Sequence, residues 1–514
     1  MNILQKKINQ NDFFGIIIIS IFSLAVNQYY GNLGIFPHDS FSHFGTGHMI
    51  INGSHPFTDF WIVSGPFIDY FQAFLFKIFG SSWKIYVFHA SIINLLVTTF
   101  TFILLRNLNL DFKRSVFFSL CFSILAYPTS GTPFVDHHST FFSLIGIYLI
   151  LNCIVKESKY ICFFIPLFFI LGFLSKQVPA FYLAVSTMPI FFLYLFFNKK
   201  FFLINYFFFG SLFFIFLIIL FSLINGISLI NFYEQYILYP QSIAKNRFEN
   251  LNISIISILG NFKFIFISLV ILILIKAIKI KKINLFLKTK ENYILLIILI
   301  TSFALMFHQI LTRNQIFIFF LIPLVLGIAS IDINDKFLKY AVIIICLFST
   351  IKYHERFNEG RKFHELQNVN LNLAVDAKLI DEKLAGLKWI TPQFKNNPLS
   401  EIKVINEIKL ILKNDKRNKM VFGNYQFLSV ILNQNLFYTT RWHVFDGSDY
   451  PLPKSSYFES YKKLNNQVAK KNDVKAVYSI LPVTTENIYD LFGKDCLVMN
   501  SLNEFITRYE FKKC

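Results

Sequence analysis

Long apolar runs alternate with short polar or basic stretches along most of the chain. A helix needs about 20 apolar residues to cross a bilayer, and about eleven runs approach that length. They cover residues 13–30, 84–105, 115–130, 139–155, 160–175, 179–198, 201–224, 254–276, 293–311, 315–331 and 338–351. The run from Pro66 to Phe79 is shorter and carries Asp69 and Lys77, so we expect an interfacial or re-entrant helix there. The pattern predicts a polytopic α-helical membrane protein.

The pattern changes after residue 351, where charged residues become frequent. In "EIKVINEIKLILK", Ile402, Ile405, Ile408 and Leu412 fall on one face of a helix. The short β-rich runs "KMVFG", "VKAVYSIL" and "CLVMN" alternate with helical patterns. We therefore expect a transmembrane domain over residues 1–351 and a small soluble α/β domain with a partly parallel sheet over residues 352–514.

Composition and charge agree with this division. A content of 54% hydrophobic residues, with 66 Phe, exceeds what the core of a soluble protein of this size can hold. The net charge of +19 comes from Lys and Arg clusters in short loops, so topology explains it better than nucleic-acid binding, and we expect no nucleic-acid partner. The first apolar run is followed by no small-residue cleavage site, which predicts an uncleaved signal anchor.

The basic clusters also predict an orientation. With Lys6 and Lys7 on the cytoplasmic side, alternate loops carry most of the cations. These loops contain Arg106, Lys113 and Arg114, then Lys156 and Lys159, then Lys199 and Lys200, then the cluster from Lys276 to Lys290, and finally Lys336 and Lys339. The positive-inside rule then places the N-terminus in the cytoplasm, and the large first loop (31–83) and residues 352–514 outside it.

The cysteines fall into two groups. Four of them, Cys121, Cys153, Cys162 and Cys346, lie in predicted spans, where thiols pack as small apolar groups. Only Cys496 and Cys514 lie in the expected external domain, and the sequence leaves open whether they form a disulfide.

The chemistry is to be sought in external polar groups close to the membrane, where a charged residue is costly unless it is paired, wet or functional. Asp39, in "FPHDSF", follows the first span and has His38 beside it. Its carboxylate could act as a general base or bind a divalent cation. It could equally cap a short helix that begins near Ser40. His43 and His48 are not spaced as a zinc-binding pair on one helical face, so we expect both to be structural.

The segment "HDSFSHFGTGHMIINGSHPFTDFWIVSGP" resembles the first external loop of the GT-C superfamily of membrane glycosyltransferases. It is similar in particular to the bacterial branch of protein mannosyltransferases and aminoarabinose transferases. In that branch an acidic motif, DD, DE, EE or HD, follows the first span, and a segment like G-x-x-P-[YF]-x-D-[FW] and then G-P comes next. Here the matching residues are His38, Asp39, Gly53, Pro56, Phe57, Asp59, Phe60, Gly65 and Pro66. The layout of about eleven spans with an external C-terminal domain is similar as well.

The resemblance implies a hexosyl- or pentosyltransferase in a bacterial inner membrane. Such an enzyme moves a sugar from a polyprenyl-phosphate donor to a hydroxyl of a glycan, lipid or protein at the external face. Asp39 would be the catalytic base, with inversion at the anomeric carbon. Some members use a divalent cation, Mg or Mn, which is the one cofactor this interpretation allows, and Asp39 and Asp136 are its possible ligands.

The donor phosphate needs cations near the external membrane face. Lys176 lies in "GFLSKQVPAFYL", at the junction of two predicted spans, and this stretch resembles a "K-Q" turn of such enzymes. Arg313 lies in "HQILTRNQ" on the same side. We expect these two residues to bind the lipid phosphate. The alternative for each is a snorkelling residue that anchors its helix.

Further polar groups are candidates for substrate contacts. Asp136, His137 and His138, in "VDHHS", could contact the acceptor or complete a metal site, and Asp136 could instead cap its helix. His38 and Asp59 could also bind the acceptor, although Asp59 could simply satisfy nearby backbone groups. His308 lies inside a predicted span and lines either a cavity or a helix contact.

Three other classes remain open. An O-antigen polymerase or ligase usually carries its large external loop between late spans, whereas here the polar loop is the first. A secondary transporter would show repeated halves with broken spans and midplane charges, which the sequence does not display convincingly. A membrane anchor for a soluble binding domain leaves the acidic residues of the first loop unexplained.

Overall fold

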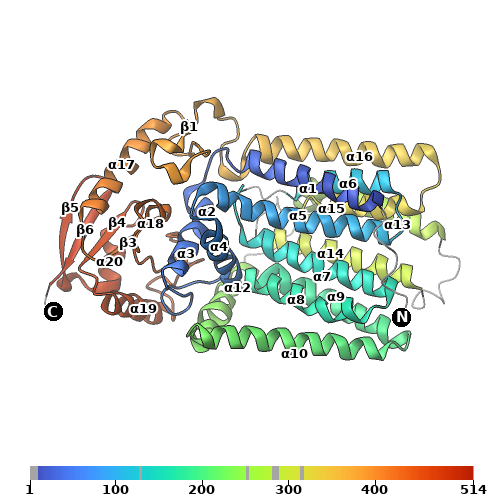
Figure 1. Cartoon of the computed structure of the whole chain (residues 1–514), viewed down its shortest axis with the longest axis horizontal. Helices are drawn as coiled ribbons and strands as arrows, with labels where there is room; N and C mark the ends of the chain where they lie inside the picture. The colour runs from blue at the N-terminus through green and yellow to red at the C-terminus, as the bar shows by residue number, and fades with distance from the viewer. Residues whose placement is uncertain (1–9, 127–129, 250–253, 280–288, 313–317, 513–514) are drawn as a thin grey trace.

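The computed structural model describes residues 10–126, 130–249, 254–279, 289–312 and 318–512. A bundle of long, roughly aligned helices forms one part of the molecule, and a smaller part with a sheet lies at one end of this bundle (Figure 1). The elements α2, α3 and α4 lie between the two parts (Figure 1). Arg313 falls outside the described residues.

All eleven apolar segments expected from the sequence overlap helices. Among the described residues, eight helices are long and apolar enough to cross a membrane. These are α1 (Gln10–Tyr30), α5 (Trp83–Asn107), α7 (Val135–Lys156), α9 (Gln177–Phe197), α10 (Phe201–Ile224), α13 (Ile255–Lys279), α14 (Lys290–Thr312) and α16 (Lys336–His354). The other three are shorter: α6 (Phe112–Leu125), α8 (Lys159–Ser175) and α15 (Leu321–Ala329). The fold is that of a polytopic helical protein.

The first loop folds into three short helices rather than a span. They are α2 (Pro37–Ser40), α3 (Ser42–Ile51) and α4 (Pro66–Phe79), and α4 has the bounds expected for the interfacial helix. Gly65 precedes α4 with a φ of 69°, and Pro66 occupies the first helical turn, where its missing N–H costs nothing. The loop between α10 and α13 contains α11 (Leu229–Phe232), a π-helical turn (Tyr233–Leu238) and α12 (Tyr239–Glu249).

The C-terminal part contains a four-stranded sheet in the order β3-β4-β6-β5. Its strands are β3 (Lys419–Phe422), β4 (Ala476–Ile480), β5 (Leu497–Ser501) and β6 (Ile506–Phe511). Strands β3 and β4 pair in parallel, and the other pairs are antiparallel, which confirms the expected partly parallel sheet. The helices are α17 (Pro398–Asn414), α18 (Phe427–Leu432), α19 (Phe458–Lys471) and α20 (Thr485–Phe492).

The packing of α17 follows its sequence pattern, because its buried positions include Ile402, Ile405, Ile408 and Leu412. A smaller sheet joins β1 (Val375–Asp376) to β2 (Lys388–Trp389). Cys496 is disulfide-bonded, and Cys514 lies outside the described residues. The four cysteines of the helical bundle are buried and free.

The first loop packs directly against the C-terminal part. The backbone N–H groups of Gly34 and Ile35 donate to the carbonyls of Lys388 and Ile390, and Trp61 N–H donates to Thr439 O. Aromatic rings of the two parts also meet, since Phe41 stacks on Trp389 with ring centroids 5.9 Å apart. The polar residues of the first loop are therefore enclosed between the helical bundle and the C-terminal part.

Candidate functional site

Asp39 lies in α2 and lines a cavity of about 440 Å³. Its side chain is about 20% exposed, and His38 Nε2 lies 3.7 Å from its Oδ2. The expectation that Asp39 caps a following helix is wrong, because Phe41 occupies the N-cap position of α3 and no side chain caps that helix. The carboxylate is thus directed to the cavity rather than used as a cap.

Four cations line the cavity with Asp39, and we call this space the basic cavity. They are Lys263 on α13, Lys352 on α16, and Arg356 and Lys362 just beyond α16. Lys352 lies within electrostatic range of Lys263 and Arg356, and Lys263 and Lys352 are 5.6 Å and 5.3 Å from the centroid of the Phe264 ring. Among the described residues, none of the four forms an ion pair with a carboxylate. A cluster of unpaired cations favours a bound anion.

Local backbone features bring these cations together. Helix α13 is interrupted at Phe262, whose φ of −112° is not a helical value. Lys263 is the next residue along the chain. Helix α16 continues into a π-helical turn over Glu355–Glu359, which carries Arg356. Such turns inside helices are frequent at functional sites.

The charges around Asp39 shift the pKa of its carboxyl group in opposite directions. Burial raises the pKa of Asp39 above its ordinary value, His38 opposes this shift, Asp136 adds to it, and Lys176 lowers it. The net direction is upward. A carboxylate with a raised pKa is a better proton acceptor when it is ionised, which suits a general base.

Asp136 forms a buried cluster with Lys176 and His308. Its Oδ2 accepts a hydrogen bond from Lys176 Nζ at 2.7 Å, and its Oδ1 lies 3.0 Å from His308 Nε2. The three residues come from α7, the junction of α8 and α9, and α14. The capping alternative for Asp136 is wrong, because the N-cap of α7 is Phe134 and no side chain caps that helix. His308 therefore makes a polar contact between helices.

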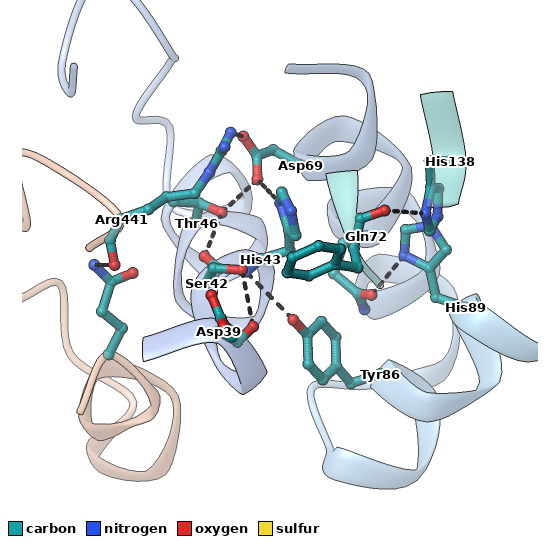
Figure 2. Close-up of polar contacts among 12 residues, drawn as sticks. Asp39, Ser42, His43, Thr46, Asp69, Gln72, Tyr86, His89, His138 and Arg441 are labelled. Carbon is teal, nitrogen blue, oxygen red and sulfur yellow. Dashed lines mark hydrogen bonds and ion pairs between the residues drawn. The ribbon is translucent and has the colours of Figure 1, made fainter. Parts of the chain in front are cut away.

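The neighbouring histidines point elsewhere. His138 Nε2 lies 2.9 Å from His89 Nε2, whose Nδ1 is 2.9 Å from Gln72 Oε1 (Figure 2). His137 is buried beside the rings of Phe134 and Phe141. Neither residue lines the basic cavity within the described ranges. In the part of the chain that the structure describes, no group of three or more His, Cys, Asp or Glu side chains is arranged to hold a metal ion.

Asp59 closes a turn and binds the C-terminal part. Its Oδ2 accepts the backbone N–H of His55 at 2.8 Å, and its Oδ1 lies 2.6 Å from Lys471 Nζ of α19. This geometry agrees with the alternative that Asp59 satisfies nearby backbone groups.

A second buried charge cluster was not anticipated from the sequence. Asp69 Oδ1 receives hydrogen bonds from His43 Nδ1 at 2.7 Å and Thr46 Oγ1 at 2.5 Å, while its Oδ2 pairs with Arg441 (Figure 2). Burial acts to raise the pKa of Asp69, but Arg441 and His43 outweigh it and hold the pKa below its usual range. His43 is therefore structural, as expected, and joins a link between α3, α4 and the C-terminal part.

Gly65 makes this link possible. A Cβ at that position would lie 2.9 Å from His43 and 3.2 Å from a guanidinium nitrogen of Arg441, and the φ of 69° disfavours any other residue.

The sequence held one indication of the role of Asp69, namely its position in an otherwise apolar segment. For Lys263 the signal was similar, because it is an isolated cation within the predicted span 254–276.

No protein-family model and no curated protein matches this chain. The resemblance to GT-C glycosyltransferases therefore remains a hypothesis that rests on the motif residues of the first loop. The geometry adds that Asp39, the acidic residue of that motif, shares a cavity with four cations.

Proposed function

We propose that this chain is a membrane glycosyltransferase that transfers a sugar from a polyprenyl-phosphate donor to an acceptor hydroxyl. One observation carries the proposal: a candidate base, Asp39, and four cations without carboxylate partners line one cavity within the described residues. The reaction needs both, since a proton must leave the acceptor while negative charge remains on the departing phosphate.

The roles follow from this placement. Asp39 takes the proton of the acceptor hydroxyl, the hydroxyl oxygen attacks the anomeric carbon, and the bond from that carbon to the phosphate oxygen breaks. The electron pair leaves with the polyprenyl phosphate, whose charge the basic cavity stabilises. A single in-line displacement inverts the anomeric carbon. Lys176 is paired with Asp136 at 2.7 Å, so in this proposal it orients Asp136 instead of binding the phosphate.

The proposed location is a bacterial inner membrane, with the basic cavity at the external face. Lys352 and Arg356 lie where α16 leaves the helical bundle on the side of the C-terminal part. A phosphate bound there could keep its polyprenyl chain between the apolar helices. The disulfide of Cys496 supports an oxidising compartment for the C-terminal part.

A transfer assay with matched carboxylate variants tests the proposal. Membranes containing the full chain are incubated with radiolabelled polyprenyl-phosphate sugars, and label in glycan, lipid and protein fractions is counted. Asp39→Asn should lower transfer about 10²-fold to 10⁴-fold, because it removes the proton acceptor while keeping the shape. Glu365→Gln is the control, since Glu365 lines the same cavity.

The role of the cations in the basic cavity is tested by the apparent KM for the donor. Lys352→Gln and Arg356→Gln should each raise the apparent KM for the donor about tenfold, the equivalent of one lost charge-assisted hydrogen bond. Lys378→Gln, on the exposed surface of the C-terminal part, should leave it unchanged. Equal transfer by wild type and Asp39→Asn would overturn the assignment of the base, and no transfer from any donor would favour the polymerase or transporter alternatives.

A further inference from the structure

An apolar groove lies between α4, α8 and α10, and we call it the α4 groove. Helix α4 lies at the end of the bundle next to the C-terminal part (Figure 1). The groove has a volume of about 410 Å³, and its lining segments, within residues 57–74, 167–174 and 214–232, are described without a gap. No charged side chain lines it, and the hydroxyl of Tyr70 is bound to His55 Nδ1 at 2.8 Å. Its walls are apolar side chains such as Phe71, Phe74, Leu171, Leu174, Leu217 and Phe221.

The open side of the α4 groove belongs to an apolar surface. Phe74, Leu217 and Phe221 line the groove and are about half exposed. Ile224 at the end of α10 and Ile230 in α11 are exposed over most of their surface. Clustered apolar side chains are costly to leave in water, and α10 is long and apolar enough to cross a membrane. This face therefore contacts lipid, and acyl chains are what covers the groove.

A cation lies on the same face of α4 as the groove lining. Lys77 follows Phe74 by three residues, which places both on one face of the helix, and both side chains are exposed. All 30 Asp and Glu residues of the chain lie in the described ranges, and Lys77 forms no ion pair with any of them. An unpaired ammonium beside an apolar groove matches a phosphate ester that carries an apolar chain.

The α4 groove is separate from the basic cavity. The two spaces share no lining residue, since the basic cavity is built mainly by α13, the end of α16 and the segment that follows it. A single cation also suits the one negative charge of a phosphate diester, whereas the basic cavity presents four cations. The ligand of the α4 groove is therefore expected to differ from the anion of the basic cavity.

We propose that the α4 groove binds one acyl chain of an anionic phospholipid, whose phosphate lies against Lys77. The lipid is a structural ligand and not a substrate, so the proposal does not depend on the proposed transfer function. The bound chain packs between α4 and the ends of α8 and α10. Since α4 carries Asp69, the lipid and the Asp69–Arg441 pair hold this helix from opposite sides, one to the bundle and one to the C-terminal part.

Photolabelling locates the lipid without any need for turnover. The probe is phosphatidylglycerol with a diazirine in one acyl chain, added to the full-length protein in nanodiscs of phosphatidylcholine, and labelled peptides are identified by mass spectrometry. We expect label on residues 167–174 of α8 and 214–222 of α10, competed by unlabelled phosphatidylglycerol. Competition by polyprenyl phosphate but not by phosphatidylglycerol would assign the groove to a polyprenyl chain and overturn the proposal.

A matched pair of variants tests whether the chain lies in the groove itself. Leu217→Trp fills the groove, whereas Leu220→Trp adds the same bulk to α10 outside the lining, and the two leucines are 42% and 40% exposed. We expect Leu217→Trp to lower the label on α8 about fivefold or more and Leu220→Trp to leave it unchanged. Equal labelling of α8 in wild type and Leu217→Trp would contradict the proposal.

The head group is tested at Lys77. Lys77→Gln should lower labelling by phosphatidylglycerol about fivefold, because the attraction of one lysine to an anionic head group is lost. It should not change labelling by a phosphatidylcholine probe with the same diazirine chain. Lys84→Gln is the control, since Lys84 is exposed in the first turn of α5 and does not line the groove. Equal losses in the two variants would mean that general surface charge collects the lipid, and would overturn the assignment of the phosphate to Lys77.

Discussion

Asp39 differs from an exposed aspartate because three charged or titratable groups act on it while burial removes water. Burial and Asp136 raise its pKa, and His38 and Lys176 lower it. Asp136 and Lys176 are themselves bound to each other at 2.7 Å. A substitution in either partner therefore leaves the charge of the other partner uncompensated at Asp39.

This coupling predicts opposite shifts in the pH dependence of transfer. A base must be ionised to accept a proton, so kcat/KM should fall as the pH decreases through the pKa of Asp39. Because that pKa is raised, the fall, which is the acid limb of the pH profile, should occur above the ordinary pKa of 3.8. Lys176→Gln should move the acid limb to higher pH and Asp136→Asn should move it to lower pH, each by roughly half a unit to one unit. The measurement is kcat/KM for the donor across the pH range.

Lys471→Gln provides the control, because it removes a cation that pairs with Asp59 at 2.6 Å and does not act on Asp39. A shift of the limb in the same direction in both Lys176→Gln and Asp136→Asn would exclude Asp39 as the titrating base.

At the scale of elements, α3 and α4 are held to the C-terminal part by the buried pair of Asp69 and Arg441. Both side chains have no exposed surface, and His43 and Thr46 complete the hydrogen bonds of the carboxylate. A buried ion pair contributes little compared with an apolar pair of the same shape, but removal of one partner leaves an uncompensated charge. The cluster therefore fixes the position of the first loop, which includes α2 and Asp39.

Single and double substitutions at this pair should be strongly non-additive. Arg441→Met or Asp69→Asn alone should destabilise the protein by about 3–5 kcal/mol, and the double variant should recover much of that loss. The measurement is thermal unfolding of each purified variant, monitored through the reactivity of the buried cysteines as they become exposed.

The matched control is Lys475→Gln, since Lys475 pairs with Asp473 at 2.6 Å where both side chains are more than half exposed. This change should cost less than about 1 kcal/mol. Additive losses in the double variant would mean that Asp69 and Arg441 act independently.

The elements themselves were largely predictable, because hydropathy and helical spacing are properties of contiguous sequence. The segments 201–224 and Pro66–Phe79 have the bounds of α10 and α4. The C-terminal bound predicted for the segment 115–130 was less accurate, since α6 ends at Leu125. Helix α13 contains a break at Phe262, which the uniform hydropathy of this segment does not reveal.

The candidate site was predictable only in part. The motif drew attention to Asp39, and the junction of two spans drew attention to Lys176. Which cations surround Asp39 depends on how α13 and the end of α16 pack, and Lys263 and Lys352 come from distant parts of the chain. The Asp69–Arg441 pair joins the first loop to a segment near the C-terminus, so neither residue alone indicated it.

At the scale of the whole molecule, the basic loops gather at the end of the bundle opposite the C-terminal part. Arg106 pairs with Asp12 near the N-terminus at 2.7 Å, and Glu157 pairs with Lys200 and Lys290 at 2.5 Å and 2.9 Å. Helix α1 begins at this end and the strands β3–β6 lie at the other (Figure 1). Positive loops favour the cytoplasm, and the orientation expected from the sequence stays a prediction that an accessibility experiment can test.

Cysteine accessibility in intact cells tests that orientation. Lys378→Cys, on the exposed surface of the C-terminal part, should react with a membrane-impermeant maleimide from outside, whereas Lys113→Cys, exposed in the first turn of α6, should react only after permeabilisation. The unmodified chain provides the background, because its bundle cysteines are buried and Cys496 is disulfide-bonded. The reverse labelling pattern would place the basic cavity on the cytoplasmic side, where its donor would have to be presented from the opposite leaflet. Labelling of both variants from outside would instead contradict the parity of the spans, since an odd number of crossings must separate the loop before α6 from the C-terminal part.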